Sequence, residues 1–333
     1  MQREKECRNT EWENLLRILP ERMRKSFIKS RLDYRKLQEI RLRINGPVYV
    51  FYDGKEYLLA EDGGLGRHLS YCLYVTTNDI RECMEYISNH SRYAYEEELR
   101  QGFITVKGGH RIGVAGKMSQ NQKEQKGLGQ VTFLNIRVAH EVKDCATDML
   151  PYLYQDGKPL HTLIISSPGS GKTTLLRDII RQMSDGNDYG AGVTVGIVDE
   201  RSEIAACYRG IPQNDVGRRT DVLDHCSKAQ GMMMLIRSMA PKILAVDEIG
   251  SQEELQVISY AMNCGITLLA TVHGRDLQEI ESKPGFETWI KGHYFRRFIL
   301  LSPNHIGRVE AVYDERGCTL FHGKKEGEAS IAS

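Results

Sequence analysis

The spacing of hydrophobic side chains changes along the first 145 residues, and the changes predict a small α+β domain. Apolar residues three and four positions apart over 11–32 predict an amphipathic helix, strained by Pro20. From residue 39 the period becomes two, and Asp53-Gly54 is typical of a hairpin turn. The predicted strands are 40–44, 48–52, 55–59, 103–106, 111–115 and 131–138, with helices over 77–89 and 91–101 and an exposed loop over 119–130.

Apolar strands and helical patterns alternate in the second half of the chain. Such alternation predicts an α/β domain with a mostly parallel, helix-covered sheet over 161–322. Strands are predicted over 161–165, 193–199, 243–247, 266–272, 297–301 and 309–313, and helices over 171–184, 226–239 and 252–264. The stretch 146–160, which holds two prolines and a glycine, is predicted as the linker between residues 1–145 and this domain, and residues 323–333 as a disordered tail.

Charge and cysteine content narrow the function classes. The 333 residues include 45 basic and 44 acidic ones, a net charge of +1, which disfavours a nucleic-acid-binding protein. No apolar run approaches the length of a membrane span, and no signal sequence is recognisable, so we expect a cytoplasmic location. The eight cysteines occur singly, a pattern that predicts neither a zinc site nor disulfide bonds.

The strongest chemical signal is the stretch Ser-Ser-Pro-Gly-Ser-Gly-Lys-Thr-Thr over 166–174, which lies between an apolar strand and a helix. Glycines without Cβ atoms let backbone N–H groups converge on phosphate oxygens at a helix N-terminus. Lys172 is then expected to reach the β- and γ-phosphates, and the Thr173 hydroxyl to ligate Mg²⁺. Ser166 stands where the first glycine of the motif usually lies, and a serine allows the turn fewer backbone conformations. The predicted nucleotide-binding residues are Pro168, Gly169, Ser170, Gly171, Lys172, Thr173 and Thr174.

Two later strands end in acidic residues that would lie at the same edge of the sheet. Ligands bind outside the carboxyl ends of strands in parallel sheets. Asp247 is therefore predicted to hold Mg²⁺, and Glu248 to polarise the attacking water as a catalytic residue. Glu200 could serve the water or the metal, or it could form a structural ion pair with Arg201.

Other candidates have a plain structural alternative. His273 ends a predicted strand and could report the γ-phosphate, or it could be an ordinary packed residue. The segment 208–224 has little periodicity and is predicted to be a functional loop. Its arginines, Arg209, Arg218 and Arg219, are candidates to contact the nucleotide of a neighbouring subunit, with solvated charge as the default for each.

Taken together, these motifs closely resemble the stage III sporulation protein AA family of secretion-superfamily ATPases. The resemblance covers nearly the whole chain. It rests on residues 167–179, 197–203, 217–224, 231–239 and 247–250, and on 108–113 and 135–137 in the first domain.

The resemblance implies a RecA-like P-loop ATPase core that uses ATP and Mg²⁺, and a smaller N-terminal domain for interaction or ring assembly. It further implies a homo-hexamer at the inner face of a membrane on the mother-cell side, partnered by membrane proteins of a channel. The site residues it implies are Lys172 and Thr173 at phosphate and Mg²⁺, Glu200 in the acidic box, Asp247 and Glu248 in Walker B, His273 in the histidine box, and Arg137 as a linker arginine toward ATP.

Three functions remain open from the sequence. The first is an ATP-hydrolysing motor of a secretion-like channel complex in endospore formation. The second is a RecA- or AAA-like nucleic-acid motor, which the near-neutral charge disfavours. The third is a nucleotide-gated scaffold with little turnover.

Overall fold

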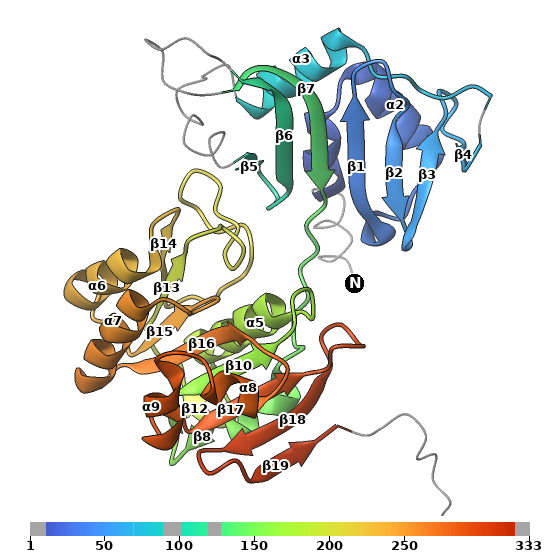
Figure 1. Cartoon of the computed structure of the whole chain (residues 1–333). Coiled ribbons are helices and arrows are strands. Elements are labelled where there is room, and N and C mark those ends of the chain that lie inside the picture. Colours follow the sequence, from blue (N-terminus) through green and yellow to red (C-terminus); the bar gives the residue numbers. More distant parts are fainter. Residues whose placement is uncertain (1–10, 69, 89–101, 119–127, 324–333) are drawn as a thin grey trace, which may run out of the picture. The chain divides into compact units, whose positions relative to one another are not determined.

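A computed structural model of the chain describes residues 11–68, 70–88, 102–118 and 128–323, and the chain divides into two compact units. The first unit ends at His140 and the second begins at Glu141. Each unit is built on one large β-sheet (Figure 1). Within the described ranges, no helix is both long enough and apolar enough to cross a bilayer.

The first unit carries an antiparallel seven-stranded sheet in the order β4-β3-β2-β1-β7-β6-β5. Its strands are β1 (Leu37–Arg43), β2 (Tyr49–Tyr52), β3 (Lys55–Leu59), β4 (Leu65–Gly66), β5 (Phe103–Thr105), β6 (Arg111–Met118) and β7 (Leu128–Arg137). Its helical segments are residues 11–18, α2 (Glu21–Ser30), η1 (Tyr34–Lys36) and α3 (Thr77–Ile87). Buried positions such as Ile40, Leu42 and Phe27 form its core.

The structure confirms the hairpin at Asp53-Gly54 and corrects two other predictions for this unit. Asp53 and Gly54 have φ values of 52° and 73°, the left-handed pair that a two-residue hairpin turn requires. The single helix predicted over 11–32 is divided at Pro20, which has an extended conformation and serves as the N-cap of α2. Strand β7 begins at Leu128, inside the predicted loop 119–130. The predicted helix 91–101 lies outside the described residues.

The second unit carries an eight-stranded sheet in the order β14-β13-β15-β16-β10-β17-β18-β19, whose first six strands are parallel. These strands are β10 (Thr162–Ser166), β13 (Val195–Asp199), β14 (Thr220–Asp224), β15 (Ile243–Val246), β16 (Thr267–His273), β17 (Arg297–Leu301), β18 (Val309–Asp314) and β19 (Thr319–His322). The helices are η3 (Thr147–Tyr152), α5 (Lys172–Asp185), α6 (Lys228–Ser238), α7 (Gln252–Asn263), α8 (Leu277–Glu281) and α9 (Phe286–Lys291). Two short hairpins pair β8 (Tyr154–Gln155) with β9 (Lys158–Pro159) and β11 (Gly186–Asn187) with β12 (Gly190–Ala191).

Alternate residues of the central strands fill two hydrophobic cores, one on each face of this sheet. Ile164 belongs to the core that contains the apolar face of α5, whereas Leu163 and Ile165 belong to the core formed with α6, α7 and α9. Burial on both faces explains why β10 appears in the sequence as a continuous apolar run. The sheet therefore presents the carboxyl ends of its parallel strands at one edge.

Two segments differ from the predictions for the second half of the chain. The predicted linker 146–160 belongs to the second unit, because Met149, Leu150 and Leu153 of this stretch are buried in its α5-side core. The predicted functional loop 208–224 contains a parallel edge strand, β14. All five residues of β14 are half-buried, so the strand lacks the alternation that would reveal it. Of the predicted disordered tail, 323–333, the structure describes only residue 323, and residues 324–333 lie outside the described ranges.

Candidate functional site

Residues 167–171 form a turn that joins β10 to the N-terminus of α5. Gly169 and Gly171 have φ values of 77° and 90°, the left-handed conformation that disfavours residues with a Cβ atom. A Cβ atom on Gly171 would lie 3.0 Å from the backbone nitrogen of Gly307, so this position is also sterically closed. Both glycines of the predicted phosphate loop are therefore required by its backbone geometry.

Ser166 replaces a glycine without disturbing this turn. It is the last residue of β10, its φ is not positive, and its side chain is fully buried. Its hydroxyl donates to the carbonyl of Ser167 at 3.0 Å, and its own carbonyl accepts from the N–H of Gly274 at 3.1 Å. A serine fits here because the strand conformation, unlike the turn that follows, accepts a side chain.

Lys172 opens α5, and its side chain is 7% exposed. The first N–H groups of a helix have no partner within the helix, and the helix dipole adds positive potential at the same end. The cation of Lys172 and the glycine turn thus concentrate positive charge in one place. This combination favours a multiply charged anion.

Asp247, which directly follows β15, accepts hydrogen bonds from the hydroxyl groups of two residues on different elements. Thr173 donates from the first turn of α5 to Asp247 Oδ2 at 2.6 Å. Thr271 donates from β16 to Asp247 Oδ1. The structure therefore brings together the hydroxyl and the carboxylate that were both predicted as Mg²⁺ ligands.

Glu248 has an unusual backbone conformation that is fixed by two neighbouring groups. Its φ of 55° is left-handed, which costs a residue with a Cβ atom roughly 1–2 kcal/mol. Its N–H donates to Thr271 Oγ1 at 2.8 Å, and its carbonyl accepts from Lys228 Nζ at 2.6 Å. Such a strained conformation, held from both sides, directs the carboxylate toward the start of α5.

Three cationic or titratable side chains surround the Glu248 carboxylate. Lys172 Nζ lies 2.8 Å and His273 Nε2 lies 2.9 Å from Oε1, while Arg201 Nη1 lies 3.2 Å from Oε2. Burial by itself would raise the pKa of Glu248, but the hydrogen bond from Lys172 and the charges around it lower the pKa below its ordinary value. The carboxylate is therefore ionised at neutral pH.

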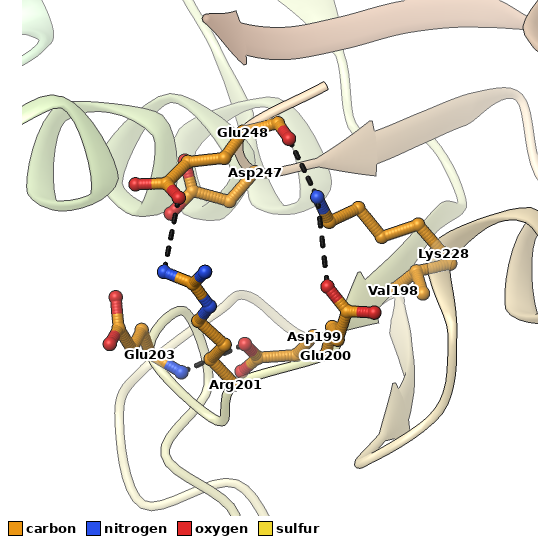
Figure 2. Close-up of a pocket in the computed structure, with 8 residues that line it drawn as sticks. All are labelled: Val198, Asp199, Glu200, Arg201, Glu203, Lys228, Asp247 and Glu248. Carbon is orange, nitrogen blue, oxygen red and sulfur yellow. Dashed lines mark hydrogen bonds and ion pairs between the residues drawn. The ribbon is translucent and has the colours of Figure 1, made fainter. Parts of the chain in front are cut away.

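A small pocket of about 20 Å³ lies beside this carboxylate and has room for roughly one water molecule. Figure 2 shows that Arg201 spans it from the β13 side to reach Glu248, and that Lys228 bridges the carboxylate of Glu200 and the carbonyl of Glu248. Lys228 Nζ is 3.6 Å from Glu200 Oε2. The suggested pairing of Arg201 with Glu200 is wrong in this structure, because Arg201 pairs with Glu248 instead.

Asp199 shapes the loop that carries Glu200 and Arg201. Its buried carboxylate accepts the backbone N–H groups of Glu203, Ile204 and Ala205 at 2.8, 3.0 and 2.8 Å. Three fixed N–H donors to one carboxylate hold the chain after β13 in a tight turn. Asp199 is thus a support for this side of the pocket.

The remaining predicted residues fall into two groups. His273 lies at the end of β16, in register with Ser166 of β10, and belongs to the cluster around Glu248. Arg137 lies in the first unit, where its guanidinium is 4.0 Å from the carboxylate of Glu39 and its side chain is 64% exposed. The loop arginines contact their own chain: Arg209 lies over the ring of Tyr208, Arg218 pairs with Asp185, and Arg219 donates to the carbonyl of Ser184.

Thr271 and Lys228 belong to the site but were not predicted from the sequence. Thr271 binds both acidic residues that follow β15, and Lys228 joins Glu200 to the backbone of Glu248. Thr271 is one of three polar residues in the otherwise apolar strand β16, with Thr267 and His273, and this is a weak signal for a site at a strand end. Lys228 gives no signal, because a lysine in the first turn of a helix is usually a solvated one.

Nearly the whole chain matches a known protein family: residues 9–320 match the family model described as Sporulation stage III, protein AA. The chain is 39% identical over 305 residues to the Stage III sporulation protein AA of Bacillus subtilis (strain 168), covering 91% of this chain and 95% of that protein. It is also 26% identical over 282 residues to uncharacterized protein ycf45 of Porphyra purpurea, covering 84% and 44% of the two chains.

The solved structures with a similar fold include a pilus retraction motor and an ATPase. The pilus retraction motor PilT with bound ADP matches with a TM-score of 0.55 and 15% identity, over 83% of this chain and 77% of that one. The ATPase DotB of Legionella pneumophila matches with a TM-score of 0.52 and 14% identity, over 79% and 72%. At such low identity these matches show the fold alone. The fold is that of the secretion ATPases, with a P-loop NTPase core, as the sequence predicted.

Proposed function

The chain belongs to the sporulation stage III, protein AA family, and we propose that it is an ATP-hydrolysing motor of a secretion-like channel complex in endospore formation. One observation carries the proposal. Lys172 and Thr173, at the start of α5, meet Glu248 and Asp247, which follow β15, at 2.8 Å and 2.6 Å. A phosphate-binding lysine and hydroxyl beside two acidic groups is the arrangement that Mg²⁺-dependent nucleotide hydrolysis requires.

The residues of this site fit ATP and Mg²⁺. The turn over 167–171 has the two left-handed glycines that a phosphate cradle needs, and Lys172 begins the helix behind it. Thr173 and Asp247 would hold Mg²⁺, which takes few protein ligands and completes its shell with phosphate oxygens and water. In the described part of the chain, no group of three or more His, Cys, Asp or Glu side chains is arranged to hold a metal. The fit of the site to Mg²⁺ therefore depends on Thr173 and Asp247.

We assign separate roles to the acidic residues and the histidine. The nucleotide supplies a phosphoanhydride bond whose cleavage releases free energy. Glu248 would polarise the attacking water once Lys172 turns from its carboxylate to the phosphates. His273, which shares Oε1 of Glu248 with Lys172, would respond to the same exchange of partners. Glu200 would act from the opposite wall of the pocket, where Lys228 holds it.

The assembly and the location follow from the family and from the kind of motor. We propose a homo-hexameric ring that lies in the cytoplasm against a membrane on the mother-cell side, with channel membrane proteins as its partners. The similar PilT protein is a pilus retraction motor and was solved with bound ADP, which supports a nucleotide-driven machine here. In such a ring, hydrolysis would be coupled to assembly, gating or transport. Arg137 would reach toward ATP from the first unit.

The test compares the wild-type chain with Lys172→Ala. We expect Mg²⁺-dependent phosphate release from ATP by the wild type, and loss of both ATP binding and phosphate release in the variant. Circular dichroism and size-exclusion chromatography would establish that the variant remains folded. Undiminished ATP binding by Lys172→Ala would refute the proposed site. ATP binding by the wild type without turnover would indicate the nucleotide-gated scaffold instead.

A further inference from the structure

The loop that follows β17, residues 302–308, packs directly against the phosphate loop. Gly307 donates its N–H to the carbonyl of Ser170 at 2.9 Å. At Gly171, an added Cβ atom would lie 3.0 Å from Gly307 N and 3.6 Å from Ile306 Cγ2. The two loops therefore approach each other closely at Gly171, where a side chain would crowd the backbone of Gly307, and Ile306 is beside the start of α5.

Ile306 is an exposed aliphatic side chain on an ordered turn. It is 84% exposed. Among the other described isoleucines, the most exposed are Ile211 at 66% and Ile28 at 55%. The turn is closed by backbone hydrogen bonds from Ser302 N to Arg308 O at 2.9 Å and from Arg308 N to His305 O at 3.2 Å. Exposure of a large aliphatic group next to a predicted phosphate site suggests a contact with an apolar part of the same ligand.

The strand order decides which side of the phosphate loop the rest of a nucleotide would occupy. Strand β10 pairs with β16 on one side and with β17 on the other. The acidic residues after β15 and His273 of β16 all lie on the β16 side, so the terminal phosphate and the metal belong there. The nucleoside, at the opposite end of the phosphate chain, would then extend toward β17. The loop at the carboxyl end of β17 is 302–308.

We infer that the loop 302–308 is the nucleoside-binding loop of this site, and that Ile306 makes an apolar contact with the face of the base. The inference rests on the proposed function, because it takes the phosphates to bind at Lys172. The faces of nucleobases are flat and of low polarity, so an aliphatic side chain can cover them without hydrogen bonds. The contact would add affinity for nucleotides and none for a phosphate chain without a base.

The experiment uses two ligands to separate the base from the phosphates. Binding of Mg·ATP and of Mg·tripolyphosphate is measured by calorimetry for the full chain and for Ile306→Ser, Ile306→Leu and Leu320→Ser. Leu320 is a matched control, an aliphatic residue 40% exposed on the edge strand β19. We expect Ile306→Ser to weaken ATP binding about tenfold, or about 1.4 kcal/mol, and to leave tripolyphosphate binding unchanged.

The Ile306→Leu and Leu320→Ser variants should bind ATP as the wild type does. Because Ile306 is mostly exposed, its replacement does not disturb a core, and each variant is expected to fold. Equal ATP affinities for Ile306→Ser and Leu320→Ser would overturn the inference. So would an equal loss for both ligands, because the loop would then act only by supporting the phosphate loop. If the wild type bound neither ligand, the proposed function itself would fail, independently of Ile306.

Discussion

The ion pair between Lys172 and Glu248 predicts that Glu248→Gln will bind ATP more tightly than the wild type while losing hydrolysis. Lys172 has to contact the β- and γ-phosphates when a nucleotide binds. In this structure its ammonium group lies 2.8 Å from the Glu248 carboxylate. The carboxylate therefore competes with the nucleotide for the same ammonium group. Glutamine has nearly the same shape but no charge, so the competition is removed while the side chain still fills its position.

The size of the effect follows from the geometry of the pair. At 2.8 Å and an effective dielectric constant of about 20, the direct attraction is about 6 kcal/mol. Most of this is offset by the cost of removing both groups from water, since the side chains are only 7% and 21% exposed. A net contribution of about 1–2 kcal/mol is typical of a charged hydrogen bond. The dissociation constant for ATP should therefore fall about 5- to 30-fold.

The assay is a titration of a fluorescent ATP analogue with Mg²⁺, together with phosphate release at saturating ATP. Glu253→Gln is the control, because it removes the same charge from an exposed position in the first turn of α7. We expect wild-type affinity and turnover for this control. Unchanged or weaker ATP binding by a folded Glu248→Gln protein would refute the competition. Undiminished turnover would remove Glu248 from the hydrolytic step.

Three further predictions concern the phosphate-loop glycines, the hydroxyl group that holds Asp247, and the stability of the first unit. In denaturant titrations, Gly171→Ala should lower the free energy of unfolding by about 1–3 kcal/mol more than Gly169→Ala does. The reason is that an added Cβ atom has open space at Gly169 but not at Gly171. Equal losses of unfolding free energy in the two variants would contradict this steric argument. Thr271→Val should reduce turnover about tenfold with ATP affinity retained, because Asp247 loses a hydroxyl donor; unchanged turnover would show that this hydroxyl does not position the acidic pair. Burial lowers the pKa of His110 from 6.5 to about 4. As the pH falls from 6.5 to 4, the unfolded chain therefore binds a proton at this histidine before the folded protein does, and the free energy of unfolding decreases by about 3 kcal/mol. The slope of unfolding free energy against pH should be shallower in His110→Phe, and an identical slope would exclude this histidine as its source.

Local patterns were sufficient to predict the phosphate loop and the strands around it. The turn over 167–171 needs glycines where φ is positive, and the strand and helix on either side have strong patterns of their own. Asp247 and Glu248 were predictable for the same reason, since they directly follow a continuous apolar strand. Predictions were weaker where an element lacked a pattern, as in the half-buried strand β14 and in the stretch 146–160.

The partners within the site were decided by the tertiary structure. The sequence by itself determined which residue types stand at the start of α5, a lysine and a threonine, and at the strand ends, a histidine and several acids. It did not determine that Arg201 pairs with Glu248 or that Thr271 binds both acidic residues of the neighbouring strand end. Those contacts join residues far apart along the chain, and they depend on the order in which the strands lie side by side. Hydrophobic periodicity records which face of a strand is buried and carries no information about its neighbour in the sheet.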